Sequence, residues 1–263
     1  MKKLLLSVTV SLLAVIYMSA EAPRSFVTNV NDSVPLTVYL PDDSVATGMM
    51  IIACPGGGYV YKAIGHEGHD FAPWLLEHGI GLAVLDYRLP EGNPSIPLSD
   101  VWAAVTSVRT SPETKRYAEK IGLMGSSAGG HLAATATVLA PDSISRPDFQ
   151  LLFYPVISLD DATITHEGSR DALLGTDASQ ELRTHYTPTH HVNSSTPPAF
   201  IMLSNDDWLV PAANGVGYYQ ALNNARTNSV LHIYPTLGHG WGVRETPFSN
   251  LWKQELLYWL STL

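Results

Sequence analysis

The sequence predicts an α/β protein, built on a mostly parallel central sheet with helices on both faces. Three observations lead to this fold class. Short apolar runs without polar alternation recur along the chain, as in strands that are buried on both faces. Longer segments with apolar residues at helical spacing lie between these runs. No internal repeat or low-complexity linker divides the 263 residues, so we expect one domain over residues 21–263.

Six apolar runs are predicted to be the buried strands of this sheet. In chain order they are residues 48–54, 80–87, 120–125, 149–157, 198–204 and 229–235. The first of them, GMMIIAC, is typical, because every residue after its glycine is apolar. A seventh segment, residues 33–41 (SVPLTVYLP), alternates more regularly and is predicted to be an antiparallel edge strand.

Five segments between or after these strands are predicted to be helices. In chain order they are residues 69–79, 99–109, 127–140, 212–222 and 248–263. The first has Phe71, Trp74 and Leu75 at helical spacing and Gly79 as a C-terminal stop signal. Val101 and Val105 similarly mark the buried face of the second.

Residues 158–197 match neither pattern and are too long for an ordinary connection between a strand and the next element. Long insertions in compact domains are often functional, so this segment is predicted to be a small cap over a site. In open α/β sheets, ligands bind at the carboxyl ends of the strands. Candidate functional residues are therefore sought directly after each strand.

Composition and the N-terminus limit the possible partners. The formal net charge of −9 opposes binding to the phosphates of nucleic acid. Residues 1–20 combine Lys2 and Lys3 with an apolar stretch and a small-residue end, which is typical of a signal peptide. We therefore expect an exported protein, periplasmic or extracellular, with no membrane association after cleavage. An uncleaved membrane anchor is the alternative interpretation of this segment.

Cys54 is the only cysteine, so an internal disulfide is impossible and the core must hold the fold together. The residue lies within an apolar run and is interpreted as a small buried side chain rather than a nucleophile.

The segment Gly125-Ser126-Ser127-Ala128-Gly129 matches the pattern G-x-S-x-G between a predicted strand and a predicted helix. In a nucleophile elbow, the two glycines relieve crowding in a tight strand-to-helix turn that exposes the central serine. This spacing makes Ser127 the candidate nucleophile and Ser126 a spacer. The helix that follows directs its positive end at the site.

The triple glycine Gly56-Gly57-Gly58 directly follows the first buried strand. Consecutive glycines are costly in backbone entropy, so we expect them to serve a close approach of the backbone to a reacting oxygen. An oxyanion hole takes one N–H from the residue after the nucleophile and others from such a loop. Gly57, Gly58 and Ala128 are the predicted donors.

An acid and a histidine follow two later strands. Asp207 comes after the run 198–204, and His239 comes after the run 229–235, so the chain order is serine, acid, histidine. In this interpretation His239 takes the proton of Ser127, and Asp207 holds the imidazole in the required tautomer. Asp206 is the neighbouring alternative for the acid. Weaker alternatives are Asp160 and Asp161.

The segment His66-Glu67-Gly68-His69 resembles a metal motif, but its histidines are three residues apart rather than the four of H-E-x-x-H. A hydrogen-bonded loop that shapes the site is the preferred interpretation. No metal and no cofactor are expected. His190 and His191 are expected to be exposed on the cap.

With these residues in place, the chain resembles secreted bacterial carbohydrate esterases of the α/β-hydrolase superfamily, the acetylxylan and feruloyl esterase-like group. The resemblance extends from about residue 35 to the end. The matching segments are PGGGY (55–59), HEG (66–68), LDYRLP (85–90), PLSD (97–100), GSSAGGHLAA (125–134), SRDALLG (169–175), SNDDWLVP (204–211) and GHGW (238–241). The resemblance implies an α/β-hydrolase fold and removal of acyl groups, often acetyl groups of xylan, with Asp207 as the acid.

Aromatic residues beside the predicted site support an acylated sugar as substrate. Tyr59 follows the glycine loop, while Trp208 and Trp241 follow the acid and the histidine closely. Such rings can stack on a sugar, although core packing explains each one equally well. Two other functions stay open: a serine exopeptidase, for which Glu67 is the only hint of a charged pocket, and a non-catalytic carbohydrate-binding protein. The sequence does not determine the oligomeric state.

Overall fold

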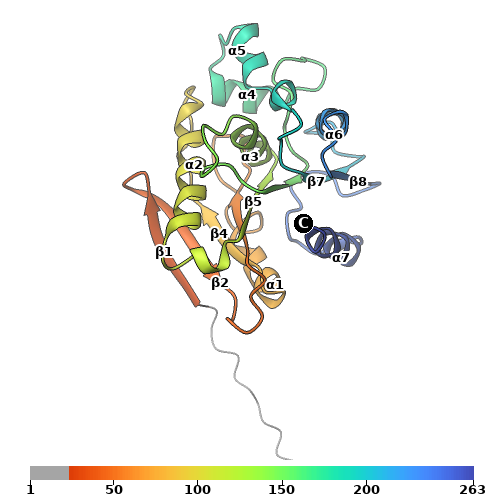
Figure 1. Cartoon of the computed structure of the whole chain (residues 1–263). Coiled ribbons are helices and arrows are strands. Elements are labelled where there is room, and N and C mark those ends of the chain that lie inside the picture. The colour runs from red at the N-terminus through yellow and green to blue at the C-terminus, as the bar shows by residue number, and fades with distance from the viewer. Residues whose placement is uncertain (1–23) are drawn as a thin grey trace, which may run out of the picture.

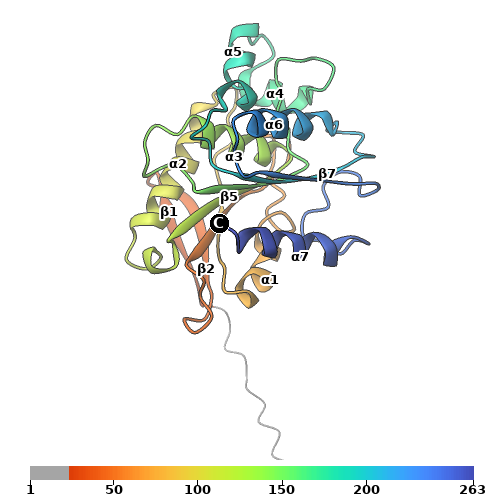
Figure 2. The same cartoon turned by 45° about the vertical axis from the view of Figure 1, so that its right-hand side comes forward.

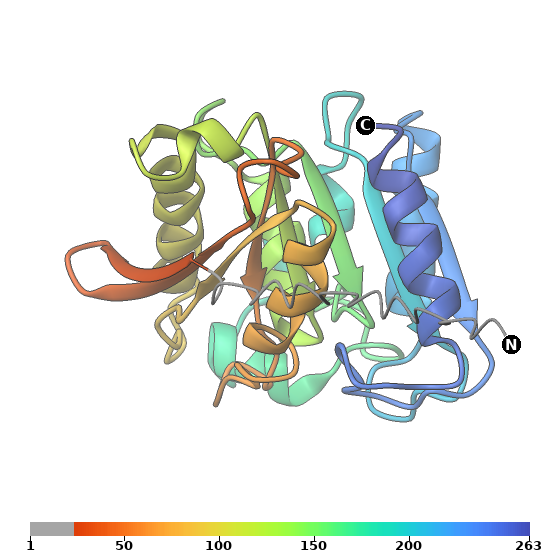
Figure 3. The ribbon, with the colours of Figure 1, turned by 90° about the horizontal axis from the view of Figure 1, so that it is seen from below.

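The computed structural model describes residues 24–263, so the expected signal segment 1–20 lies outside it. Over the described range, eight strands form one sheet in the order β1-β2-β4-β3-β5-β6-β7-β8. The strands are β1 (Arg24–Val30), β2 (Val34–Leu40), β3 (Met49–Cys54), β4 (Gly81–Leu85), β5 (Lys120–Ser126), β6 (Phe149–Phe153), β7 (Ala199–Ser204) and β8 (Val230–Tyr234). The β1–β2 hairpin forms one edge of the sheet and β8 the other (Figure 3).

The strands β4, β3, β5, β6, β7 and β8 are parallel, as the sequence predicts. Neighbouring side chains on β3 enter different cores, because Ile52 lies in one buried cluster and Ile51 in the other. Burial on both faces explains why these strands read as continuous apolar runs. The mostly parallel sheet of the predicted fold class is confirmed.

Helices cover both faces of the sheet (Figures 1 and 2). On one face lie α2 (Ser95–Thr110), α3 (Ala128–Val138) and α6 (Ala213–Asn224). On the other lie α1 (Ala72–Glu77), which follows the short turn His69–Phe71, and α7 (Ser249–Leu260). In the range 24–263, no helix combines the length and the apolar character that crossing a membrane requires.

The predicted edge strand over 33–41 needs a correction. Its residues form β2 and pair antiparallel with β4, but β1 pairs along its other side and is the true edge. The strand β1 was not predicted, because its burial pattern is mostly exposed and gives only a weak apolar signal. Asn31 and Asp32 join the two strands at positive φ, a conformation that these residue types tolerate in turns.

The segment 158–197, called the cap here, contains regular structure that was not predicted. It carries α4 (Glu167–Leu174) and α5 (Gln180–His185), and both lie beyond α3 on the same side of the sheet (Figures 1 and 2). Several hydrogen bonds join the cap to the rest of the protein. Among them, Gly92 N–H donates to Ala172 O at 3.0 Å, and His131 Nε2 lies 2.7 Å from Tyr186 O.

Candidate active site

Ser127 occupies a strained turn between β5 and α3. Its φ of 54° and ψ of −124° are unusual for a residue with a side chain, and its N–H donates to Phe153 O at 3.0 Å. The flanking glycines are required sterically. A Cβ on Gly125 would lie 2.1 Å from Gly129 O, and one on Gly129 would lie 2.0 Å from Cys54 O. The geometry is that expected of a nucleophile elbow.

A continuous hydrogen-bonded chain joins the predicted serine, histidine and acid. Ser127 Oγ lies 2.8 Å from His239 Nε2, and His239 Nδ1 lies 2.7 Å from Asp207 Oδ2. An ionised carboxylate only accepts hydrogen bonds, so Nδ1 carries the proton and Nε2 accepts the hydroxyl proton of Ser127. Asp207 is held in turn by the N–H groups of Leu209 and Val210, each 2.9 Å from its Oδ1.

The alternative acid Asp206 does not contact His239. Its Oδ1 accepts from the Ser204 hydroxyl and from the N–H groups of Leu237 and Gly238. These bonds lower the pKa of the Asp206 carboxyl, and the hydrogen bond from Ser204 is the largest cause. Asp206 therefore anchors the loop that carries His239, while its neighbour faces the imidazole.

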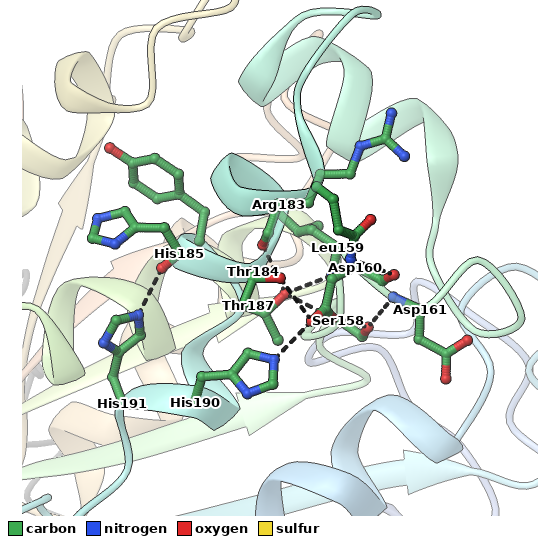
Figure 4. A network of polar contacts seen from close by, with 12 residues as sticks. Ser158, Leu159, Asp160, Asp161, Arg183, Thr184, His185, Thr187, His190 and His191 are labelled. Carbon is green, nitrogen blue, oxygen red and sulfur yellow. Dashed lines mark hydrogen bonds and ion pairs between the residues drawn. The ribbon is translucent and has the colours of Figure 1, made fainter.

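The weaker alternatives Asp160 and Asp161 lie in the cap (Figure 4). Asp160 accepts from Ser158 Oγ at 3.0 Å and Thr187 Oγ1 at 3.1 Å, and its Oδ2 lies 2.7 Å from His190 Nε2. Asp161 accepts from Thr163. These contacts organise the cap and leave Asp207 as the carboxylate that holds His239. His190 is exposed, as expected, while His191 is half-buried.

The predicted oxyanion donors have backbone geometry suited to that role. Gly57 and Gly58 have φ of 133° and 64°, and Ala128 is the first residue of α3. Among the hydrogen bonds within residues 24–263, none is donated by the N–H of any of these three residues. A Cβ on neighbouring Gly56 would lie 3.0 Å from Ser127 Cβ, so the glycine loop runs directly against the serine.

Two of the three predicted sugar-stacking residues need a correction. Tyr59 is only 2% exposed, and its hydroxyl lies 2.8 Å from His131 Nδ1. Trp241 is 5% exposed and packs against Phe153, with ring centroids 5.4 Å apart. Both belong to the core, so neither presents a free ring face to a substrate. Trp208 is 81% exposed and is the only one of the three available for stacking.

The cap contributes a residue near the site that the sequence did not single out. His166 is the N-cap of α4, where its Nδ1 accepts from Ser169 N–H at 3.2 Å. Burial lowers the pKa of His166, and the nearby His239 adds to this effect. Ser169 Oγ lies 4.0 Å from the position that a Cβ on Gly58 would take, so α4 begins beside the glycine loop. Only the length of the insertion hinted at such a residue.

The loop containing His66 and Glu67 is hydrogen-bonded as expected. Glu67 is buried, and its two carboxylate oxygens accept from Gly56 N–H at 2.7 Å and Tyr154 OH at 2.8 Å. Both oxygens of the Glu67 carboxylate are therefore hydrogen-bonded inside the protein, so Glu67 does not form the open charged pocket that an exopeptidase would need. Cys54 is also buried, and burial raises the pKa of its thiol to about 12, which agrees with a packing role.

Comparison with known families agrees with this geometry. The profile of a family described as having the alpha/beta hydrolase fold matches residues 51–243. The chain belongs to this α/β-hydrolase family. The match covers β3 to the loop after β8, and it therefore includes the glycine loop, Ser127, Asp207 and His239. The predicted α/β-hydrolase fold and the resemblance to esterases of this superfamily are confirmed.

The relatives of this α/β hydrolase include proteins named for xylan chemistry. It is 36% identical over 94% of its length to an acetylxylan esterase of Xylanibacter ruminicola, and it covers 52% of that protein. It is 30% identical over 89% of its length to endo-1,4-beta-xylanase B of Butyrivibrio fibrisolvens, and it covers 38% of that one. The chain thus spans about half or less of the length of these two relatives.

A solved structure matches the α/β hydrolase over nearly its full length. It is an acetyl ester-xyloside bifunctional hydrolase from Caldicellulosiruptor lactoaceticus, with a TM-score of 0.82 and 33% identity. The match covers 93% of this chain and 98% of that one. A carboxylesterase from Lactobacillus plantarum matches with a TM-score of 0.76 at 23% identity, which supports the fold alone.

Proposed function

We propose that this protein is a serine esterase that hydrolyses acyl esters, in particular acetyl esters, on xylan or related plant saccharides. The observation that carries the proposal is the hydrogen-bonded chain from Ser127 through His239 to Asp207. The three side chains belong to loops after three different strands, β5, β8 and β7, and they meet at one end of the sheet. A structural role alone does not require a strained serine, an oriented imidazole and a buried acid to meet there.

The first half of the reaction transfers the acyl group to Ser127. Ser127 Oγ attacks the ester carbonyl carbon as its proton passes to His239 Nε2. The negative oxygen of the tetrahedral intermediate accepts hydrogen bonds from the N–H groups of Ala128, Gly57 and Gly58. His239 then gives its proton to the sugar oxygen, the bond between that oxygen and the acyl carbon breaks, and the alcohol leaves.

The second half returns the enzyme to its resting state. A water molecule attacks the acyl-enzyme carbonyl while His239 Nε2 takes one of its protons. The second tetrahedral intermediate uses the same N–H donors. His239 reprotonates Ser127 Oγ as the carboxylic acid leaves. Asp207 stays ionised throughout and stabilises the imidazolium that forms in each half.

Two considerations support an acylated saccharide as substrate. The similar proteins named above are an acetylxylan esterase and an acetyl ester-xyloside hydrolase. Trp208, adjacent to the acid, offers an exposed ring on which a sugar can stack. Export of the protein, expected from residues 1–20, belongs to the same proposal and is checked by locating the activity in fractionated cells.

One substrate panel tests the proposal: p-nitrophenyl acetate, butyrate and octanoate, acetylated xylan, and an aminoacyl-p-nitroanilide. We expect turnover of p-nitrophenyl acetate and release of acetate from acetylated xylan, with weak activity on octanoate. Cleavage of the anilide alone would contradict the esterase and favour an exopeptidase. Binding of acetylated xylan without turnover of any substrate would favour the non-catalytic alternative.

A further inference from the structure

A buried acid and phenol connect two loops of the site that the sheet does not join directly. The glycine loop follows β3 and the loop of His239 follows β8, and these strands lie far apart in the sheet order. Glu67 Oε2 accepts from Gly56 N–H at 2.7 Å, and its Oε1 accepts from Tyr154 OH at 2.8 Å. The Tyr154 oxygen accepts from Gly242 N–H at 2.7 Å. We call this chain of three hydrogen bonds the Glu67–Tyr154 bridge.

Both ends of the bridge lie against the reacting groups. The ring of Tyr154 packs edge-on against the imidazole of His239, with centroids 4.8 Å apart. At the other end, a Cβ on Gly56 would lie only 2.7 Å from Glu67 Oε2 and 3.0 Å from Ser127 Cβ. A further bond, from Val243 N–H to His66 O at 3.0 Å, runs beside the bridge and joins the same two loops.

The bridge is buried and its hydrogen bonds have a defined direction. Glu67 and Tyr154 are both buried, so each unmade bond would leave a buried polar group without a partner. Burial and the charge of Glu67 raise the pKa of Tyr154 well above its usual range, so the phenol stays protonated and donates to the carboxylate. Tyr154 also adopts a positive φ of 37°, a conformation that its surroundings must maintain.

We propose that Glu67 and Tyr154 are positioning residues that hold the oxyanion donors and the imidazole of His239 at a fixed separation across Ser127. The proposal rests on the esterase function above. Oxyanion donors and a general base act in the same transition state, and errors of about half an ångström in their placement reduce catalysis. Because one carboxylate and one hydroxyl hold both loops, loss of either should disturb both groups together.

Tyr154→Phe tests the bridge with the smallest change. It keeps the ring against His239 but removes the hydroxyl that joins Glu67 to Gly242. We expect kcat on p-nitrophenyl acetate to fall about tenfold or more, a smaller loss than removal of an oxyanion donor causes. The two loops lose the link through the Tyr154 hydroxyl and keep the Val243–His66 bond, so their separation is less well fixed. KM for this small ester should change by less than about threefold, since both residues of the bridge are buried and do not line the surface that a substrate reaches.

Glu67 provides a rescue experiment. Glu67→Gln keeps an oxygen that accepts from Gly56 and supplies an amide that can donate to the Tyr154 oxygen. The phenol proton, which Glu67 accepts in wild type, then turns to the neighbouring Ser126 hydroxyl, so most of kcat should be retained. Glu67→Ala removes both partners and should lose at least as much kcat as Tyr154→Phe. Equal losses for Gln and Ala would mean that the hydrogen bonds do not carry the effect.

Tyr218→Phe is the matched control. Tyr218 is another buried tyrosine, and its hydroxyl donates to Gln150 Oε1 at 2.9 Å at the start of β6, the end of the sheet opposite the site. Both Phe variants should lower the midpoint of thermal unfolding by similar amounts, while only Tyr154→Phe lowers kcat. A kcat for Tyr154→Phe within twofold of wild type, or a rise in KM alone, would overturn the positioning proposal.

Ester turnover by wild type and labelling of Ser127 separate the positioning proposal from the esterase function on which it rests. If wild type turns over esters and Ser127 reacts with an organophosphonate, the esterase function stands whatever Tyr154→Phe shows. If wild type shows neither turnover nor labelling, the esterase function fails and the positioning proposal fails with it.

Discussion

At the residue scale, two adjacent serines have different backbone positions, because Ser126 ends a strand and Ser127 forms the turn into the next helix. Ser126 is the last residue of β5, and its hydroxyl is buried beside Tyr154, away from His239. Ser127 begins the turn, and its hydroxyl reaches His239. The glycine spacing predicted this difference, because only a residue with a glycine two positions away on each side can occupy the crowded turn.

We expect Ser127→Ala to reduce kcat on p-nitrophenyl acetate by at least about 10⁴-fold, because it removes the nucleophile. Ser126→Ala should keep kcat within about threefold, since the Ser126 hydroxyl neither attacks the ester nor passes a proton to His239. Steady-state kinetics of the two purified variants, each checked by circular dichroism, measure the difference. Similar losses in both would show that the turn was misassigned.

At the scale of elements, α3 links the site to the cap. His131, one turn after Ser127, is buried between Tyr59 of the glycine loop and Tyr186 of the cap. The Tyr186 carbonyl can only accept, so Nε2 of His131 carries the proton and Nδ1 accepts from the Tyr59 hydroxyl. Burial lowers the pKa of His131 to about 4, so this residue is neutral at physiological pH.

This shift predicts a loss of stability in acid. An unfolded histidine binds its proton below a pKa of about 6.5, whereas folded His131 resists protonation until about pH 4. The unfolded state therefore binds more protons between these values, and the free energy of unfolding decreases as pH falls through this window. From pH 7.5 to 5, the contribution of His131 should decrease by about 2 kcal/mol.

His131→Gln isolates this contribution, because its amide can donate to Tyr186 O and its oxygen can accept from Tyr59. Urea unfolding at pH 7.5 and 5 should show a smaller acid loss in the variant than in wild type. The other histidines are common to both proteins and cancel in the comparison. Parallel losses would show that His131 is not the titrating group.

The predictability of each element follows from how it is buried. β7 is buried throughout and β3 at every residue but its first, so their apolar runs were recognised. The helix α5 has no buried residue and β1 only one, so neither leaves a periodic signal. β6 ends at Phe153, earlier than predicted, because the following Tyr154 turns to positive φ and Pro155 has no N–H for a ladder.

At the scale of the whole molecule, the sheet separates two cores. One contains the packed faces of α2, α3 and α6, and the other contains α1, α7 and an aromatic cluster around Phe153. Trp252 of α7 lies at the centre of that cluster, with its ring 5.7 Å from Phe153 and 5.6 Å from Trp74. Trp252 is therefore a major contact between the C-terminal helix and the rest of this core.

We expect Trp252→Ala to lower the free energy of unfolding by about 3–5 kcal/mol, because it leaves a large cavity between α7 and the sheet. Leu251→Ala, on the exposed side of the same helix, should change it by less than about 0.5 kcal/mol. Urea denaturation followed by circular dichroism compares the two. A loss below 1 kcal/mol for Trp252→Ala would show that α7 repacks without its tryptophan.

The site residues that directly follow strands could be predicted from the sequence. Those placed by tertiary packing could not. Ser127, Asp207 and His239 each follow a strand, so their convergence follows from a parallel sheet. His166 reaches the same region from the cap, whose path no local pattern specifies. Tyr59 and Trp241 are adjacent in sequence to site residues, but their side chains turn into the core. A position next to a site residue in the sequence places the backbone near the site, but it does not determine where the aromatic ring points.

Because Trp208 is exposed, its intrinsic fluorescence can report on binding near the site. Its five other tryptophans are buried or half-buried, so a water-soluble quencher such as acrylamide should act mainly on Trp208. In Ser127→Ala protein, which binds substrate without consuming it, acetylated xylo-oligosaccharide should protect that fluorescence if the sugar stacks on the indole. Xylo-oligosaccharide stripped of acetyl groups would reveal how much of the protection the acyl group contributes. Unchanged acrylamide quenching with both sugars would show that the saccharide does not stack on Trp208.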